Sequence, residues 1–360
     1  MWLVNAPTPA PTRRSEKLRA AAQQEFDGAT ERSLESLSLS AGVVAFIVVA
    51  LVTLPVFRLE AAPIAGPDSI GQFVAVASAT VALVVFGAGR YLVRRARRGA
   101  PLRVLDHLDI AALALAHAIT ALLSWTLVAS IMERSFIGAE VYPLPLIALG
   151  GATAFVTAYA VFASATQMDL PLLAIVLAGF LVEGGVTAML TASDPQWWKL
   201  NLSALGMTDD LSAFAFNITL IIAGFIVTTL ARYVTIGIPT PHPHGARNVR
   251  ISLIVVGVFL AGVGVFPVDE FFLLHTGVAS GMAVAFGVLV IALKWWVPGI
   301  ARAFLSLGWL FVGVIVVLAV MFATGAYTLT AVELVAGVLV FAWIILFIRN
   351  AAALQADATP

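Results

Sequence analysis

The chain has 360 residues, of which 61% are hydrophobic and only 11% are charged, a composition that excludes a soluble globular protein. The 20 basic and 20 acidic residues cancel, and cysteine is absent, so disulfides, thiolate metal sites and cysteine nucleophiles are excluded too. We expect no nucleic acid as a partner, because the basic residues lie in the N-terminal tail and in short positions beside apolar stretches.

Residues 1–37 are polar, carry five of the cations and lack the apolar core of a secretory signal. We expect them to form a cytoplasmic extension. Its part from about Arg13 to Leu37 has a helical, charge-mixed pattern with a weak hydrophobic side. Two alternatives stay open for this part: a helix resting on the membrane surface, or a partly disordered tail.

Ten apolar stretches follow, each long enough to cross a bilayer as a helix. They predict an all-α membrane protein, a polytopic bundle of about ten transmembrane helices within a domain at 38–350, followed by a short cytoplasmic tail at 351–360. The predicted spans are residues 39–57, 69–93, 108–132, 145–165, 172–192, 213–232, 251–268, 275–293, 304–323 and 331–348.

The cations predict the orientation of these spans. Seventeen of the Lys and Arg residues fall on the side of the N-terminus, and only Arg58, Arg134 and Lys199 fall on the other side. Since cytoplasmic loops retain Lys and Arg, we expect both termini in the cytoplasm. The predicted location is the cell membrane, most simply a bacterial plasma membrane.

Polar residues inside the third predicted span form a seam. Asp106, Asp109, His117, Thr120 and Ser124 follow one another in steps of three and four, interrupted by one apolar position. His117 lies near the bilayer centre, where an imidazole needs a hydrogen-bond partner. The functional interpretation is a proton relay or a ligand contact, and the structural one is a bond to a neighbouring helix.

The fifth predicted span carries Glu183, followed at intervals of four by Thr187 and Thr191. Because a low dielectric disfavours a bare carboxylate, we expect Glu183 to be protonated, paired with His117 or bound to a cation. A functional carboxyl and a neutral acid that bonds across helices are both open interpretations.

The segment 193–212 between the fifth and sixth spans alternates apolar and polar residues around Trp197 and Trp198. This pattern predicts a short interfacial or re-entrant element, because tryptophan anchors at headgroup level. Candidate ligand contacts on the same side are Asp209, Asp269, Glu270 and His275. This outer mouth either binds a ligand or serves only to anchor the chain.

Several short motifs resemble a known family. They are the run 198–206, Phe216-Asn217, Gly224, the run 264–267 and His275. Over about residues 172–293 they resemble the bacterial membrane family called domain of unknown function nine-nine-eight, itself distantly similar to Frag/DRAM/Sfk-type multispanning proteins; the first four spans are unassigned. The resemblance implies a shared fold and a role at the membrane, without a reaction. The positions it brings forward are Ser203, Asn217, Pro267 and His275.

Three classes of function stay open. The first is a lipid-binding, partner-binding or structural membrane protein with an outward-facing polar mouth; membrane lipids are the expected partners, and a small-molecule or protein partner is unspecified. The second is a secondary transporter with a relay of Glu183 and His117, since ten spans divide into five plus five. The third is a membrane-embedded hydrolase that uses the outer acids and the histidines as metal ligands or as acid and base.

Of these classes we favour the first, and therefore expect a protein that is not an enzyme. The motifs GxGxxG, GxxxxGK[ST] and HExxH are absent from the sequence, so nucleotide-binding and zinc-peptidase functions have no support. We expect no cofactor and no resident metal.

Overall fold

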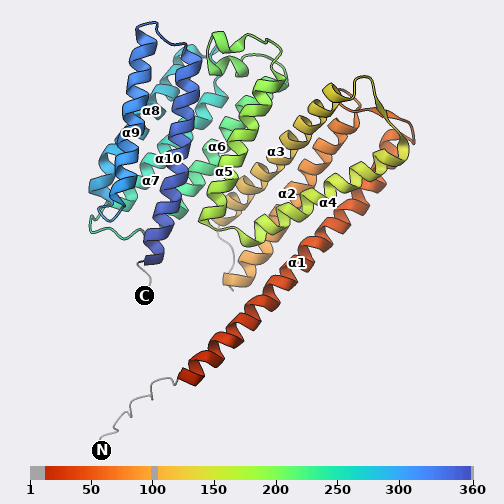
Figure 1. The fold of residues 1–360 in the computed structure, drawn as a ribbon, viewed down its shortest axis with the longest axis horizontal. Helices are drawn as coiled ribbons and strands as arrows, with labels where there is room; N and C mark the ends of the chain where they lie inside the picture. The colour runs from red at the N-terminus through yellow and green to blue at the C-terminus, as the bar shows by residue number, and fades with distance from the viewer. Residues whose placement is uncertain (1–12, 99–103, 358–360) are drawn as a thin grey trace, which may run out of the picture.

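The computed structural model describes residues 13–98 and 104–357. Within these residues, ten helices are long and apolar enough to cross a membrane, which confirms the predicted all-α polytopic bundle (Figure 1). They are α1 Arg13–Phe57, α2 Ile70–Arg98, α3 Val104–Ser135, α4 Pro143–Gln167, α5 Leu170–Thr191, α6 Leu211–Thr235, α7 Gly245–Val265, α8 Phe272–Trp296, α9 Arg302–Ala323 and α10 Leu329–Asp357.

Most helices extend beyond their predicted spans, and α10 continues to Asp357 where its span was predicted to end at 348. α1 continues without interruption across the predicted junction at residues 37 and 38, where the hydroxyls of Ser38 and Ser40 donate to carbonyls four residues earlier and follow the helix. The side chains of residues 13–32 lie outside the described part, so the predicted surface helix is not tested there. α7 begins at Gly245 rather than at 251, because the three prolines between the helices end at Pro243.

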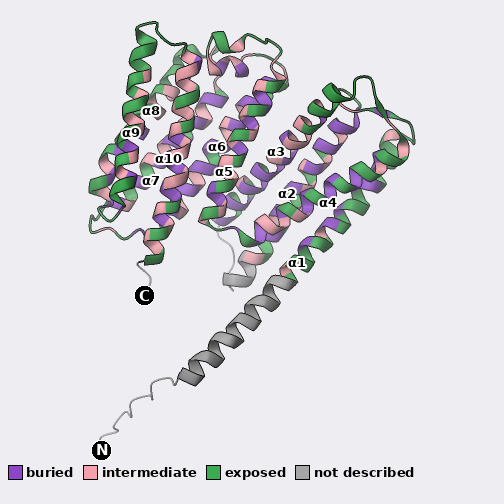
Figure 2. Cartoon of the chain, viewed as in Figure 1, coloured by how far each residue is buried: buried purple, intermediate pink, exposed green. Residues whose placement is uncertain are grey.

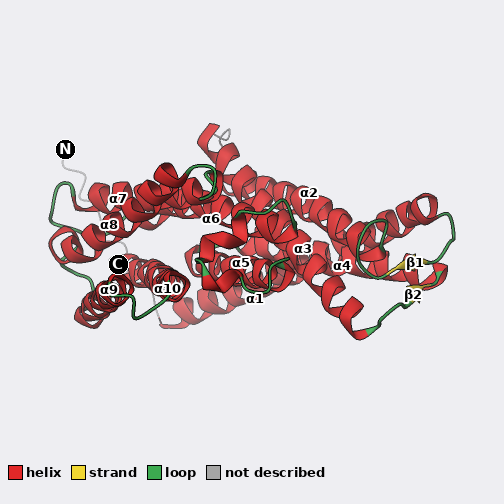
Figure 3. Cartoon of the chain, turned by 90° about the horizontal axis from the view of Figure 1, so that it is seen from above, coloured by secondary structure: helices red, strands yellow, loops and turns green. Residues whose placement is uncertain are grey.

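The short elements lie in the links between helices. β1 Ala62–Pro63 pairs antiparallel with β2 Glu140–Val141 and joins two links (Figure 3). The links 58–69, 136–142, 192–210, 266–271 and 324–328 share one end of the bundle, and both ends of the described chain lie at the opposite end (Figure 1). We call the first the outer end and the second the inner end, following the orientation that the cations predict.

The helices form two groups. α1 to α4 pack together and are inclined relative to α5 to α10, and α3 joins the groups through its contacts with α5 and α6 (Figure 1). One large hydrophobic core extends from α2 to α10. Figure 2 shows buried residues concentrated in the middle helices and exposed residues along α1 and α9. α6 is therefore central, whereas α1 and α9 present apolar surface to the surrounding lipid.

Glycines allow α6 and α7 to approach closely. A Cβ at Gly224 would overlap the carbonyl oxygen of Gly257 and the backbone of Ala261. Small residues bring backbones together in this way inside membranes, where packing replaces the hydrophobic driving force. The pair α6 and α7 thus packs closely beneath the outer link that precedes α6.

Candidate functional site

The outer mouth consists of residues 193–210 together with the first turns of α8 and α10. Two 3-10 helices, η1 Trp197–Lys199 and η2 Leu202–Gly206, occupy the place of the predicted interfacial or re-entrant element. Leu205 is buried with Phe216 of α6 in a small apolar cluster. The cluster holds η2 against the end of the bundle and so places the polar groups of the mouth.

Ser203 and His275 pair inside the mouth. Nδ1 of His275 lies 2.7 Å from the carbonyl oxygen of Phe266, which accepts only, so this nitrogen carries the hydrogen. In the neutral ring Nε2 then accepts from the hydroxyl of Ser203 at 2.9 Å. Both side chains are buried. The pair joins α8 to η2 and satisfies two polar groups that would otherwise be buried without partners.

Side chains of α10 also form hydrogen bonds to η1 and η2. The backbone amides of Leu202 and Ser203 donate to the carboxyl group of Glu333. The hydroxyl of Thr330 donates to the carbonyl of Trp198 at 2.7 Å. Two amides that point at one carboxylate resemble an oxyanion hole in chemistry, but here the protein's own acid occupies them.

Asn217 ties η2 to α6. Its Nδ2 donates to the carbonyl of Gly206 at 3.0 Å, and a Cβ at Gly206 would overlap the Asn217 side chain. Glycine at 206 is therefore required by the close approach. Of the four positions brought forward by the family resemblance, Ser203, Asn217 and His275 meet around η2.

The outward side of the mouth is aromatic and aliphatic. Trp198 is 50% exposed and Leu200 is 59% exposed, whereas Trp197 is partly buried against the apolar cluster. The ammonium group of Lys199 lies 5.7 Å from the ring centroid of Trp198, within the range of a cation–π contact. The surface offered to the surroundings is thus a tryptophan and a leucine with one cation.

The predicted acids of the mouth are solvent-facing. Asp209, Asp269 and Glu270 are all exposed. No group of three or more His, Asp or Glu side chains in the described ranges is placed to hold a metal ion, so the ligand set of the hydrolase hypothesis is not assembled there. The acid and base alternative of the hydrolase hypothesis stays a prediction.

Asp210, next to the predicted Asp209, has a structural role. Its carboxylate accepts from the amide of Ala213 at 3.0 Å and caps the N-terminus of α6. Partial burial opposes its ionisation, but hydrogen bonds from Ser193, Thr208 and Ala213 outweigh burial and lower the pKa of the Asp210 carboxyl. The ionised cap anchors the end of the mouth to α6.

The two mid-membrane candidates have separate partners. Nδ1 of His117 donates to the carbonyl of Leu113 at 2.8 Å, Nε2 lies 2.9 Å from the hydroxyl of Ser164, and the ring stacks on Phe86. Glu183 accepts a hydrogen bond from Ser124. The direct pair of Glu183 and His117, one of the predicted states of this acid, is therefore not formed in the described structure.

Unpartnered hydroxyls lie near Glu183. The Oγ1 atoms of Thr187 on α5 and Thr219 on α6 are buried without a hydrogen-bond partner. A Cβ at Gly184 would overlap the side chain of Thr219, so that threonine lies directly against the residue after Glu183. The α5 face thus presents a polar strip inside the bundle.

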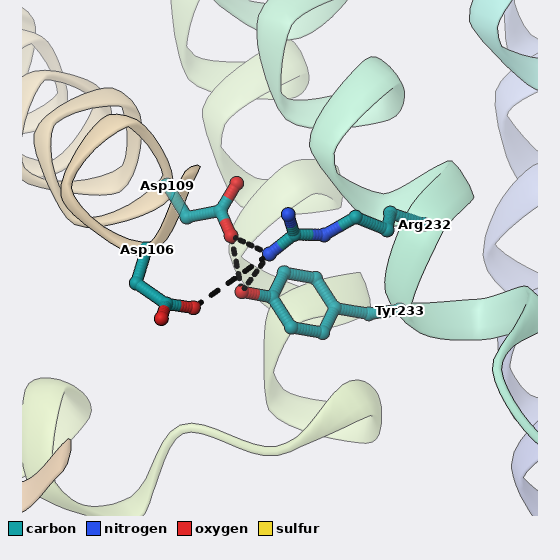
Figure 4. A network of polar contacts seen from close by, with 4 residues as sticks. All are labelled: Asp106, Asp109, Arg232 and Tyr233. Carbon is teal, nitrogen blue, oxygen red and sulfur yellow. Dashed lines mark hydrogen bonds and ion pairs between the residues drawn. The ribbon is translucent and has the colours of Figure 1, made fainter. Parts of the chain in front are cut away.

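A charged network lies at the inner end (Figure 4). Arg232 of α6 forms an ion pair with Asp109 of α3 and lies 3.8 Å from Asp106. The hydroxyl of Tyr233 donates to the same Asp109 oxygen. The Asp106 and Asp109 end of the predicted seam therefore bonds to α6 and fixes the two groups of helices to each other.

Sequence reasoning missed three of these residues as site components. They are Arg232, Ser164 and Glu333, none of which the sequence analysis names as a candidate site residue. Asp106 and Asp109 precede the third predicted span or lie in its first turn, and Arg232 ends the sixth span on the same predicted side, so their shared depth is the signal that points to Arg232. Ser164 lies in a span rich in small residues and gives no such signal.

These features define the class: a polytopic α-helical membrane protein with a cross-linked outer mouth. No protein-family profile, curated protein or solved structure matches this chain. The resemblance to the family called domain of unknown function nine-nine-eight therefore rests on the quoted residues and stays a prediction.

Proposed function

We propose that this membrane protein binds lipid at its outer mouth. The observation that carries the proposal is the contrast between the two sides of the segment 193–210. Its polar groups bond to α6, α8 and α10, while Trp198 and Leu200 face outward. A mouth that recognises a polar solute needs open polar groups, whereas an aromatic and aliphatic surface beside a cation suits lipid at headgroup level.

The test compares two tryptophans in similar settings. Trp198 is 50% exposed beneath Lys199 at the outer end, and Trp295 is 55% exposed with Lys294 over its ring at the inner end. We expect Trp198→Ala to lower the retention of bound phospholipid in native mass spectrometry by about fivefold, or ~1 kcal/mol. Trp295→Ala should leave it unchanged.

Two results would reject the proposal. Equal losses from Trp198→Ala and Trp295→Ala would make Trp198 a general interfacial anchor and would reject the proposal. Full retention after Trp198→Ala would reject it as well. The thermal unfolding midpoint of each variant in detergent shows whether the fold has been kept.

The transporter remains a second candidate because of the strip around Glu183. An acid bonded to Ser124, with the unpartnered hydroxyls of Thr187 and Thr219 on nearby helix faces, is the kind of intramembrane polar group that marks ion pathways. In reconstituted vesicles, Glu183→Gln should abolish proton or cation flux, and Glu140→Gln in an exposed outer link should not. Flux that is the same in both variants would exclude Glu183 as the carrier of protons or cations.

A further inference from the structure

A groove lies between α1 and α2 in the outer half of the first group of helices. Both helices pack on α4 and contact each other little, which leaves a space of about 1090 Å³ between them. This volume exceeds the ~300–1,000 Å³ of most small-molecule pockets. Its apolar walls include Val48, Val52 and Val56 of α1 and Phe73, Val76 and Val81 of α2.

The groove opens to the membrane. Val52 and Val76, one from each wall, are 45% and 56% exposed, and both helices are candidate membrane spans. The buried Val49 and the partly buried Ala77 lie deeper and pack with residues of α4. An occupant would therefore enter sideways from the bilayer, with apolar parts against valine and phenylalanine.

α4 supports the groove through glycine. A Cβ at Gly150 would lie 2.7 Å from Oγ1 of Thr53 on α1 and 3.4 Å from the ring of Phe73 on α2. Since both neighbours approach the same bare backbone position, the spacing of α1 and α2 is set by the packing of three helices. The groove is thus a feature of the backbone arrangement and does not depend on one side-chain rotamer.

The rim of the groove is charged and polar. Arg58, Glu60, Asp68, Ser69 and Gln72 line its outer end, where α1 finishes and α2 begins. In the part of the chain that the structure describes, neither Arg58 nor Glu60 nor Asp68 takes part in a salt bridge. A guanidinium group and two carboxylates are therefore available to an occupant at headgroup depth.

Backbone strain is concentrated at this rim. Arg58, Leu59 and Asp68 have φ values of +53°, +61° and +56°, and they are the non-glycine residues with positive φ among those described. Such conformations cost about 1–3 kcal/mol each and persist where the surroundings impose them, commonly at ligand sites. The pairing of β1 with β2 and the bond from the Gly71 amide to the Ile64 carbonyl at 3.0 Å hold this link in place.

We infer that the groove binds one membrane phospholipid whose headgroup carries both a phosphate and an ammonium group. The acyl chains lie along the apolar walls, Arg58 pairs with the phosphate, and Glu60 and Asp68 pair with the ammonium. A purely anionic headgroup would leave Glu60 and Asp68 without a partner, and a purely cationic headgroup would leave Arg58 without one. The groove is formed by other helices than the outer mouth, so this site stands or falls independently of the proposed function.

The first arm of the test fills the groove from each wall. Val52→Trp and Val76→Trp place a large ring in it, while the matched controls Val44→Trp and Val84→Trp change residues of the same two helices that are 62% exposed and do not line it. In native mass spectrometry after exchange into equal phosphatidylethanolamine and phosphatidylglycerol, we expect retained phosphatidylethanolamine to fall about tenfold in the first pair only. Equal retention in all four variants would overturn the inference.

The second arm tests the headgroup. The double variant Glu60→Gln with Asp68→Asn should remove the preference for phosphatidylethanolamine, because it keeps shape and removes the partners of the ammonium. Asparagine also tolerates the positive φ at position 68. Arg58→Gln should lower the retention of both lipids, and Arg58→Lys should restore part of it. Absence of any preference in the unaltered protein would reject the headgroup assignment.

Parallel measurement with Trp198→Ala separates the two lipid sites. Loss of lipid after Trp198→Ala with no loss after Val52→Trp and Val76→Trp would reject the groove and leave the mouth. The reverse pattern would reject the mouth and leave the groove.

Discussion

Ser203 and His275 lie 72 residues apart in the chain and share a hydrogen bond of 2.9 Å within the outer mouth. The imidazole also donates to the carbonyl of Phe266, so one ring joins η2, the link after α7 and the start of α8. A hydroxyl, an imidazole and an orienting acceptor form the geometry of a nucleophile with its base. The amides of Leu202 and Ser203 are occupied by Glu333, which favours a structural role for the pair.

Removal of this imidazole should destabilise the mouth. We expect His275→Ala to lower the free energy of unfolding by about 1–3 kcal/mol, because the Ser203 hydroxyl and the Phe266 carbonyl lose a buried partner. His242→Ala, at an exposed histidine of the inner link, is the control. Thermal unfolding in detergent measures the difference, and covalent reaction of Ser203 with a fluorophosphonate would contradict the structural role.

Two adjacent glycines of α5 should respond differently to the same change. A Cβ at Gly184 would overlap Thr219, whereas a Cβ at Gly185 meets nothing within 4 Å. We expect Gly184→Ala to cost about 1–3 kcal/mol by forcing α5 away from α6, and Gly185→Ala to be neutral or stabilising. Thermal unfolding of both variants checks this, and equal midpoints would contradict the close packing of α5 on α6.

The ion pair at the inner end should show coupling. Asp109 is buried and Arg232 is only partly buried, so we expect Arg232→Gln and Asp109→Asn each to cost about 1–3 kcal/mol, between the values for surface and buried pairs. The double variant should cost less than the sum, since neither charge is then left alone. Additive losses in unfolding would show that the pair contributes no interaction energy.

The cap of α6 should depend on pH. Asp210→Ala should cost about 1 kcal/mol at neutral pH because the Ala213 amide loses its acceptor. The pKa of Asp210 is lowered in the folded protein, so its ionised form stabilises the fold above the ordinary value of about 3.9. That contribution is lost as the pH falls through the lowered pKa. The difference in unfolding free energy between the wild type and Asp210→Asn should therefore begin to shrink as the pH falls below about 4.

The predicted orientation has a direct test, because the chain contains no cysteine. Lys199→Cys at the outer mouth should react with an impermeant maleimide added to intact cells, and His242→Cys in the link between α6 and α7 should react only after permeabilisation. Both positions are in links, so neither change disturbs a span. The opposite labelling pattern would reverse the assignment of outer and inner ends.

The ten spans could be predicted because each is a local property. A helix that crosses hydrocarbon satisfies its own backbone, so length and apolar composition are sufficient to identify it. The predicted start of the seventh span, residue 251, was less accurate, because α7 already begins at Gly245, shortly after the last proline of the preceding link. The short element around Trp197 and Trp198 could also be predicted, since apolar and polar residues alternate there over a few positions.

Hydrogen-bond partners were harder to predict. Glu183 bonds to Ser124 and His117 bonds to Ser164, and serines occur in several of the apolar spans. The spacing of the third span marks Ser124 as part of its polar seam but does not name Glu183 as its partner, and Ser164 has no signal in composition or spacing at all. The groove between α1 and α2 had no signal either, because its walls are valines like those of every other span.

The sequence alone determined that the chain lies in a lipid bilayer and that it has ten helices able to cross that bilayer. Both conclusions follow from the favourable transfer of apolar residues into hydrocarbon. Only the tertiary structure decided which polar groups meet. Arg232 reaches Asp109 and Ser203 reaches His275 because α6 and α8 pack at particular places in the bundle. The same packing, with α1 and α2 both seated on α4, leaves the groove whose rim carries Arg58 and Asp68.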